Sequence, residues 1–225
     1  MILQRLSAYY VRVSLDPKAS DALPKPGYSV QKVSFCVVLR PDGTLLEFQS
    51  ILDEGNTKPV PRQMLVPGQS KPTGQGINPC FLWDNAAYML AFKLDDPSPD
   101  RTQKSFESFR KLHLDLADAV DAASFNAVCA FLHAWSPDKA REHAAELAPL
   151  ATHFGVFKIA GAHSFVHDDP KVIEFCASSS NTEGSAAAAS QGFCLVTGER
   201  GPIARLHEPK IKGVAGAQSS GALLV

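Results

Sequence analysis

The sequence predicts an α+β fold in which a hairpin-rich, mixed β-sheet carries an inserted helical subdomain at about residues 84–150. Three observations support this prediction. Two β-branched and aromatic runs are joined by Pro-Asp-Gly at residues 41–43, a strong hairpin turn. Apolar residues then recur at helical spacing from Phe106 to Val120, and "FGVFKIAG" at residues 154–161 returns to a strand pattern. The helical stretch therefore interrupts a β pattern that resumes after it.

The region before the insertion begins with a helix. Apolar residues recur at three- and four-residue steps from Leu3 to Val13, and the helix should end before Pro17. We expect its apolar face to pack in the core. The hairpin follows at residues 32–52, and "QMLVP" predicts a short strand between two loops. These loops are expected at residues 53–63 and 68–80.

The insertion itself should contain about four helices. Asp84 or Asn85 can cap the first. The second, in "SFESFRKLHLDLADAV", has Leu112 on its apolar face. Two more are predicted in "DAASFNAVCAFLHAW" and "SPDKAREHAAELAPL". Ser136 caps the last of these, with Pro137 at the first helical position.

A helix and a loop are expected after the returning strand. "HSFVH" continues the β pattern, and Asp169-Pro170 starts a helix that runs through Phe175. The stretch that follows is rich in serine and alanine and of low complexity. It predicts a flexible loop at about residues 178–191.

The C-terminal segment predicts a second hairpin. It lies in "GFCLVTGERGPIARLH", with its turn near Glu199 to Gly201. The chain then ends in an apolar run without a polar cap. We therefore expect the chain to be cut from a longer protein.

The composition indicates a globular protein without a membrane span. Of the 225 residues 45% are hydrophobic, yet no run approaches roughly 18 apolar residues, and the N-terminus lacks a signal-peptide pattern. The five cysteines are scattered and include no Cys-x-x-Cys pair. We therefore expect free, mostly buried thiols, a cytoplasmic location and no structural zinc site.

The formal net charge of −1 conceals a segregation of charge along the sequence. Residues 56–78 hold three bases and no acid, and residues 200–216 hold four bases and one acid. Between them, residues 84–146 hold eleven acids against seven bases. This pattern is typical of an anion-binding face on a neutral body, with ordinary solvated loops as the alternative.

The glycine-rich stretch at residues 66–85, "VPGQSKPTGQGINPCFLWDN", does not match the known nucleotide-binding motifs. A Walker A loop needs a lysine after its second glycine and then a helix. Here Gly74 is followed by Gln75, and Pro79 intervenes before any helix. A Rossmann fingerprint fails for the same reason, because no helix opens directly after the glycines.

Metal and catalytic sites are not indicated either. His163 and His167 lie close to Asp168, but in a strand they would share a face only loosely. Cys129 and His133 have helical spacing on an apolar face, where a buried histidine in the core is the usual outcome. We expect no catalytic residue, no metal and no cofactor.

The chemistry of the glycine-rich stretch suits DNA. Its glycines allow close backbone approach and its prolines hold it extended. Lys71, Gln75 and Asn78 carry groups that contact phosphates and base edges. A long ordered turn with incidental polar side chains is the alternative.

Four phrases, "MILQRLSAYYVRV", "GINPCFLWDNAAYML", "FVHDDPKV" and "CLVTGERGPIARLHEPKIKGVAGAQSSGA", together resemble the N-terminal region of the large subunit of type I-C CRISPR Cascade, the Csd-one type. The resemblance spans essentially the whole chain in order. It implies a non-enzymatic, N-terminal DNA-recognition domain of a longer subunit. Such a domain binds invading double-stranded DNA, recognises the protospacer-adjacent motif and helps to open the duplex.

The resemblance also implies partners and site residues. The partners would be double-stranded target DNA, other Cascade subunits with guide RNA, a recruited helicase-nuclease and phage anti-CRISPR proteins, with no membrane. Carried onto this chain, the resemblance places DNA contacts in the loop around Lys71 to Asn78 and in the segment from Lys210 to Ser220. The charge of the two basic segments adds predicted phosphate contacts near Lys58 and Arg205. The predicted DNA-contacting residues are Lys58, Arg62, Lys71, Thr73, Gln75, Asn78, Arg205, Lys210, Lys212, Gln218, Ser219 and Ser220.

Two other functions remain open at this point. The domain could instead be a protein-docking module that anchors the large subunit to the guide-RNA-capping subunit. A nuclease is disfavoured, because the sequence shows no clustered carboxylates with a basic partner.

Overall fold

The computed structural model describes residues 2–16, 27–53, 59–69, 71, 76–183, 191–202, 207–211 and 222–224. The chain divides into two compact units. The larger comprises Gly27–Ala177, and the smaller combines Met1–Pro26 with Ser178–Val225. Each unit is described by itself below.

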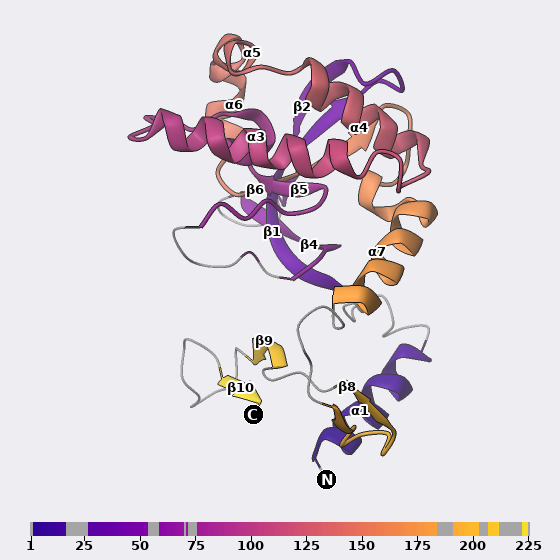
Figure 1. The fold of residues 1–225 in the computed structure, drawn as a ribbon. Coiled ribbons are helices and arrows are strands. Elements are labelled where there is room, and N and C mark those ends of the chain that lie inside the picture. Colours follow the sequence, from indigo (N-terminus) through magenta and orange to yellow (C-terminus); the bar gives the residue numbers. More distant parts are fainter. Residues whose placement is uncertain are drawn as a thin grey trace. The chain divides into compact units, whose positions relative to one another are not determined.

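The larger unit is built on a six-stranded mixed sheet in the order β3-β4-β1-β6-β5, with β2 also paired to β1 (Figure 1). The long first strand pairs antiparallel with β2 and β4 and parallel with β6. The predicted α+β class is confirmed. The strands are β1 Tyr28–Leu39, β2 Leu45–Ser50, β3 Leu52–Asp53, β4 Val60–Pro67, β5 Trp83–Asn85 and β6 Phe154–Ile159.

Helices fill the sequence between β5 and β6, as the sequence predicts. Asn85 caps α2 by accepting a hydrogen bond from the Ala87 backbone N–H, and Ser136 caps α5 by accepting one from Lys139. Both capping predictions are confirmed. The helices are α2 Ala86–Leu90, α3 Pro99–Asp115, α4 Ala123–Ala134, α5 Pro137–Glu142 and α6 Ala144–Leu150.

These helices share a hydrophobic core with the sheet. Successive residues of a strand point to opposite faces. Phe35 and Val37 accordingly join the main core with residues of α2, α3 and α4, whereas Cys36 and Val38 join a second cluster around Trp83. From Val33 to Leu39, β1 is thus buried on both faces. The wider division into a helical insertion within a 1–225 domain stays a prediction.

The first hairpin turns where the sequence predicts, between β1 and β2. Gly43 has a φ of +84°, a conformation that favours glycine. A Cβ at this position would lie 2.6 Å from the Cβ of Ala130 and 2.7 Å from the backbone oxygen of Ala127, both on α4. The turn therefore packs directly against a helix.

Several element boundaries differ from the prediction. β4 begins at Val60, within the segment expected to be a loop. "HSFVH" at residues 163–167 does not form a strand. Phe165 makes an isolated bridge to Lys158 of β6, and a 3₁₀ turn, η2 (Val166–Asp168), follows. α7 (Pro170–Glu183) starts where predicted but continues into the stretch expected to be a flexible loop. Residues 184–190 of that stretch lie outside the described residues.

The smaller unit contains α1 (Ile2–Ser14) and two short hairpins. α1 is confirmed as a helix, but the expectation that its apolar face is buried is wrong. Leu6, Tyr9 and Tyr10 of that face are exposed, and Leu3 and Val13 are only half-buried. The hairpins are β7 Gln191–Phe193 with β8 Arg200–Pro202, and β9 His207–Ile211 with β10 Ala222–Leu224.

The β7–β8 hairpin turns earlier than predicted. The Cys194 N–H donates to the Glu199 oxygen at 2.8 Å, and the Gly198 N–H donates to the Cys194 oxygen at 2.8 Å. The turn therefore spans residues 194–199. Cys194 is exposed, unlike Cys36, Cys129 and Cys176, and all five cysteines are free thiols. No described helix is both long and apolar enough to cross a bilayer.

Candidate nucleic-acid interface

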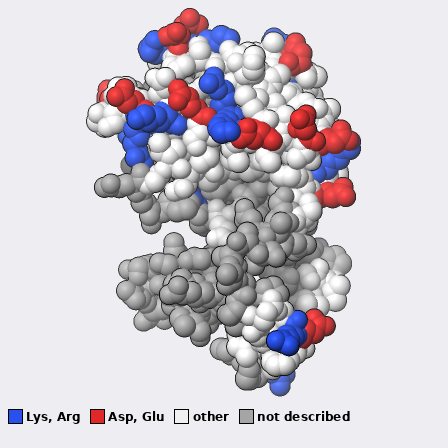
Figure 2. Space-filling view, in the orientation of Figure 1, with Lys and Arg blue, Asp and Glu red and all other residues white. Residues whose placement is uncertain are grey.

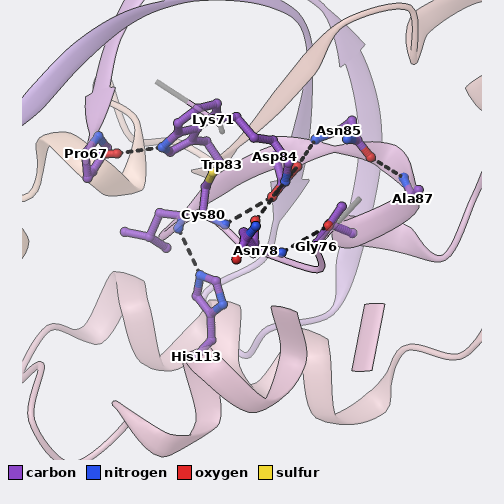
Figure 3. A network of polar contacts seen from close by, with 12 residues as sticks. Pro67, Lys71, Gly76, Asn78, Cys80, Trp83, Asp84, Asn85, Ala87 and His113 are labelled. Carbon is purple, nitrogen blue, oxygen red and sulfur yellow. Dashed lines mark hydrogen bonds and ion pairs between the residues drawn. The ribbon is translucent and has the colours of Figure 1, made fainter. Parts of the chain in front are cut away.

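The glycine-rich loop that links β4 to β5 is closed at its neck by a buried indole. Trp83, fully buried at the start of β5, donates its ring N–H to the backbone oxygen of Pro67, the last residue of β4, at 2.6 Å (Figure 3). This contact brings the two ends of the loop together.

A buried ion pair lies just inside this neck. The Lys71 ammonium contacts both carboxylate oxygens of Asp84 (Figure 3). Asp84 is fully buried and the Lys71 side chain is 16% exposed. The carboxylate also accepts backbone N–H bonds from Cys80 at 3.0 Å and from Asn85 at 2.7 Å. A buried carboxylate of this kind needs such a set of donors to offset the loss of water.

The third donor of the Lys71 ammonium is also used inside the protein. It donates to the backbone oxygen of Asn78 at 3.1 Å, and the Nζ lies 3.5 Å from the centre of the Tyr88 ring. An ammonium has three donors, so Lys71 is saturated. The phosphate contact predicted for Lys71 would require this arrangement to open.

Burial dominates the protonation equilibria around the ion pair. It raises the pKa of the Asp84 carboxyl above its ordinary value, although Lys71 and the backbone donors act in the opposite direction. Burial and the adjacent Asp84 charge raise the pKa of the Cys80 thiol to about 12. Cys80 therefore remains a protonated thiol at neutral pH.

Two side chains from the helices hold the last part of the loop, from Asn78 to Leu82. The Asn78 backbone N–H donates to the Tyr88 hydroxyl at 3.2 Å. The Leu82 N–H donates to His113 Nε2 at 2.9 Å, and Nδ1 of the same ring faces the Phe109 oxygen at 2.8 Å. Because Nε2 accepts, the proton resides on Nδ1. Burial lowers the pKa of His113 to about 4.

The buried position of His113 was not predicted. The apolar spacing of α3 placed Leu112 on the buried face, but Leu112 is only half-buried while the neighbouring His113 is fully buried. His113 packs among Phe81, Phe109 and Phe125. The signal that could have indicated the burial of His113 was a histidine among phenylalanines.

The described end of the loop near Asn78 exposes polar groups to solvent. Asn78 is exposed, and its side-chain nitrogen lies 2.9 Å from where a Cβ of Gly76 would be. Arg101 on α3 donates to the Gly76 oxygen at 3.4 Å. A cavity of about 630 Å³ opens beside this end of the loop. It is lined by Ile77, Pro97, Ser98, Pro99, Asp100, Arg101 and Lys104.

The comparison with protein families decides the identity of the chain. Residues 6–225 match the family model of the CRISPR-associated protein Csd1. The chain belongs to the Csd1 family. It is a CRISPR-associated Cascade protein, and this membership implies other Cascade subunits and nucleic acid as partners. A search among curated proteins found no match.

The remaining DNA-contacting residues predicted for this Csd1-family chain are only partly described. Arg62 is exposed on β4, opposite Val33 of β1, and Lys32 is exposed opposite Gln63. The side chain of Lys210, on β9, is not described. Outside the described residues lie Lys58, Thr73, Gln75, Arg205, Lys212, Gln218, Ser219 and Ser220. The structure thus joins Lys71 and Asn78 in one network, and the assignment of DNA contacts stays a prediction.

Charge on the visible face of the Csd1-family chain is mixed. Figure 2 shows acidic and basic side chains interspersed over the helical part in that view. Two exposed ion pairs of the described residues join Lys111 with Asp115 on α3 and Arg141 with Asp138 on α5. A single-sign patch is therefore not a feature of the described residues on this face.

Metal ligands do not gather in the part of the chain that is described. His163 is exposed, whereas His167 is buried with its ring stacked on Phe165. The two histidines therefore do not share a site. His133 on α4 is exposed, so the expectation of a core histidine there is wrong, although Cys129 on the same helix is buried.

Proposed function

We propose that this region of a Cascade subunit is a non-catalytic module that binds double-stranded target DNA in the cytoplasm. It recognises the protospacer-adjacent motif and starts unwinding of the duplex. Membership of the Csd1 family supports a role within Cascade. The observation that carries the proposal is the anchored loop between β4 and β5, with Asn78 at its exposed side.

Anchoring matters because recognition by a mobile loop costs conformational entropy on binding. The network of Trp83, Lys71, Asp84 and Tyr88 holds the described ends of the loop before DNA arrives. A polar side chain on such a support can discriminate base edges, whereas phosphate contacts fix register alone. Base pairing with guide RNA then reads the rest of the target.

A binding assay with the assembled complex tests this proposal. Duplexes that differ only in the sequence flanking the target are titrated at several salt concentrations. We expect one flanking motif to bind at least about tenfold more tightly than the others. Equal affinity for all flanking sequences, at every salt concentration, would contradict motif recognition.

We also propose that the module has no hydrolytic activity of its own. Cleavage would then belong to a helicase-nuclease recruited by the complex. Incubation of the complex with duplex DNA and Mg²⁺, Mn²⁺ or Zn²⁺ should leave the DNA intact. Metal-dependent cleavage that is lost on His163→Ala or Asp168→Ala would show that this proposal is wrong.

A second candidate function rests on α1. Leu6, Tyr9 and Val11 expose apolar surface on this helix, and such surface is typical of protein contacts. α1 could anchor the subunit to the guide-RNA-capping subunit. Leu6→Lys with Val11→Lys should then prevent incorporation into the complex, and Arg5→Ala on the same helix should not. Normal incorporation of the double variant would exclude α1 as the anchor.

A further inference from the structure

We propose that Lys71 is a positioning residue, which holds the motif-reading loop through buried Asp84 and makes no contact with DNA phosphate. This inference rests on the proposed function. It differs from the sequence-based prediction, in which Lys71 is one of several phosphate-binding cations.

The first step of the argument is the saturation of the ammonium. Both carboxylate oxygens of Asp84 and the backbone oxygen of Asn78 accept from Lys71, and the Tyr88 ring covers the charge. A phosphate would have to displace the buried carboxylate from this site. That displacement would leave Asp84 buried and without its cation, which is strongly unfavourable.

The second step of the argument is the rigid attachment of Asp84, the ion-pair partner of Lys71. Asp84 lies on β5, where it pairs with Gly155 of the sheet, and the next residue, Asn85, caps α2. The carboxylate is therefore attached to the junction of a strand and a helix. Lys71 ties the start of the loop to this junction.

The third step is the reach of the same contacts along the loop. Lys71 binds the Asn78 oxygen, and Asp84 accepts from the Cys80 N–H. Tyr88 contacts both the ammonium and the Asn78 N–H. The buried charge pair and Tyr88 together thus hold the backbone at Asn78 and Cys80. Asn78 carries the exposed side chain proposed to read the motif.

Removal of the charge in two stages tests the inference. Lys71→Met keeps the aliphatic stem but leaves Asp84 without its cation, and Lys71→Met with Asp84→Asn removes both charges. In the complex we expect Lys71→Met to reduce affinity for the preferred motif at least about tenfold, with a small effect on other motifs. Asp84→Asn in the same chain should restore much of the preference.

The slope of log affinity against log salt separates positioning from phosphate binding. Loss of one phosphate contact makes the slope shallower by about 0.9. A positioning residue leaves the slope unchanged. Lys111→Met is the matched control, because it breaks a Lys–Asp pair that is exposed on α3, and it should leave both the motif preference and the slope unchanged.

Amide hydrogen exchange of residues 76–85 in the DNA-free complex tests the positioning role of Lys71 independently of motif recognition. Faster exchange in Lys71→Met, with recovery in the double variant, supports positioning even if the wild-type complex shows no motif preference. In that event motif recognition is refuted, but the positioning role of Lys71 is supported. Unchanged exchange, or a uniform loss of affinity with a slope shallower by about one, overturns the inference.

Discussion

The ring of Phe35 on β1 packs directly over the Cα of Gly155, its partner in register on β6. A Cβ at residue 155 would lie 2.2 Å from the ring atom Cζ. Gly155 also pairs with Asp84 on its other side. The absent side chain therefore lets a core phenylalanine pack at the centre of the sheet, next to the strand that carries the loop anchor.

We expect Gly155→Ala to lower the free energy of unfolding by about 1–3 kcal/mol, since the added methyl must displace the Phe35 ring. Phe35→Leu should recover part of this loss when combined with Gly155→Ala. Chemical denaturation measures both. Gly201→Ala is the control, because nothing lies within 4 Å of a Cβ there. Equal effects of the two alanine substitutions would show that the ring adapts freely.

His113 should make stability depend on pH. Its pKa falls from 6.5 to about 4 on folding because the ring is fully buried. Between these values the unfolded chain binds a proton that the folded chain does not. The stabilisation is therefore complete above pH 6.5 and decreases as the pH falls towards 4, by about 3 kcal/mol in total.

Thermal unfolding of wild type and His113→Gln across this pH range measures the effect. The glutamine oxygen can accept from the Leu82 N–H but does not titrate. The pKa of His167 is also lowered by burial, so some pH dependence should persist in the variant. If stability changes with pH in the same way in wild type and in His113→Gln, His113 is not responsible for the pH dependence.

Local rules predicted the elements whose causes are local. The Asp42-Gly43 turn, the Asn85 cap and the start of α5 at Pro137 follow from a few adjacent residues. Their formation depends on backbone geometry within one turn. These features were therefore readable from the sequence.

The loop anchor could not be predicted in this way. Lys71 and Asp84 are thirteen positions apart in the sequence. Leu82 and His113, which are hydrogen-bonded, are thirty-one positions apart. Only the packing of α2 and α3 on the sheet brings these groups together. The sequence therefore placed Lys71 among solvent-facing cations, since its charge was visible and its buried partner was not.

The salt dependence of binding should report the phosphate contacts. If about five are made, the slope of log affinity against log salt should be roughly −4 to −5. Arg62→Ala removes an exposed cation on β4 and should make the slope shallower by about 0.9. Arg141→Ala, which breaks an exposed ion pair on α5, is the control and should have no effect. A wild-type slope near zero would contradict an electrostatic interface.

Asn78 allows the sharpest test of motif recognition, because its network contacts use the backbone. The N–H binds Tyr88 and the oxygen binds Lys71, and alanine keeps both. We expect Asn78→Ala to cost roughly 1–3 kcal/mol on the preferred motif and far less on others, without a change in melting temperature. Gln75→Ala should act in the same direction.

Asn85→Ala provides the matched control for Asn78→Ala. The Asn85 side chain caps α2, so its loss should lower the stability by about 1 kcal/mol and reduce binding to all motifs by the same factor. If Asn78→Ala behaves like Asn85→Ala, with a lower melting temperature and equal losses on every motif, Asn78 stabilises its own turn and does not read bases. A loss confined to the preferred motif, with the melting temperature unchanged, is the signature of base recognition.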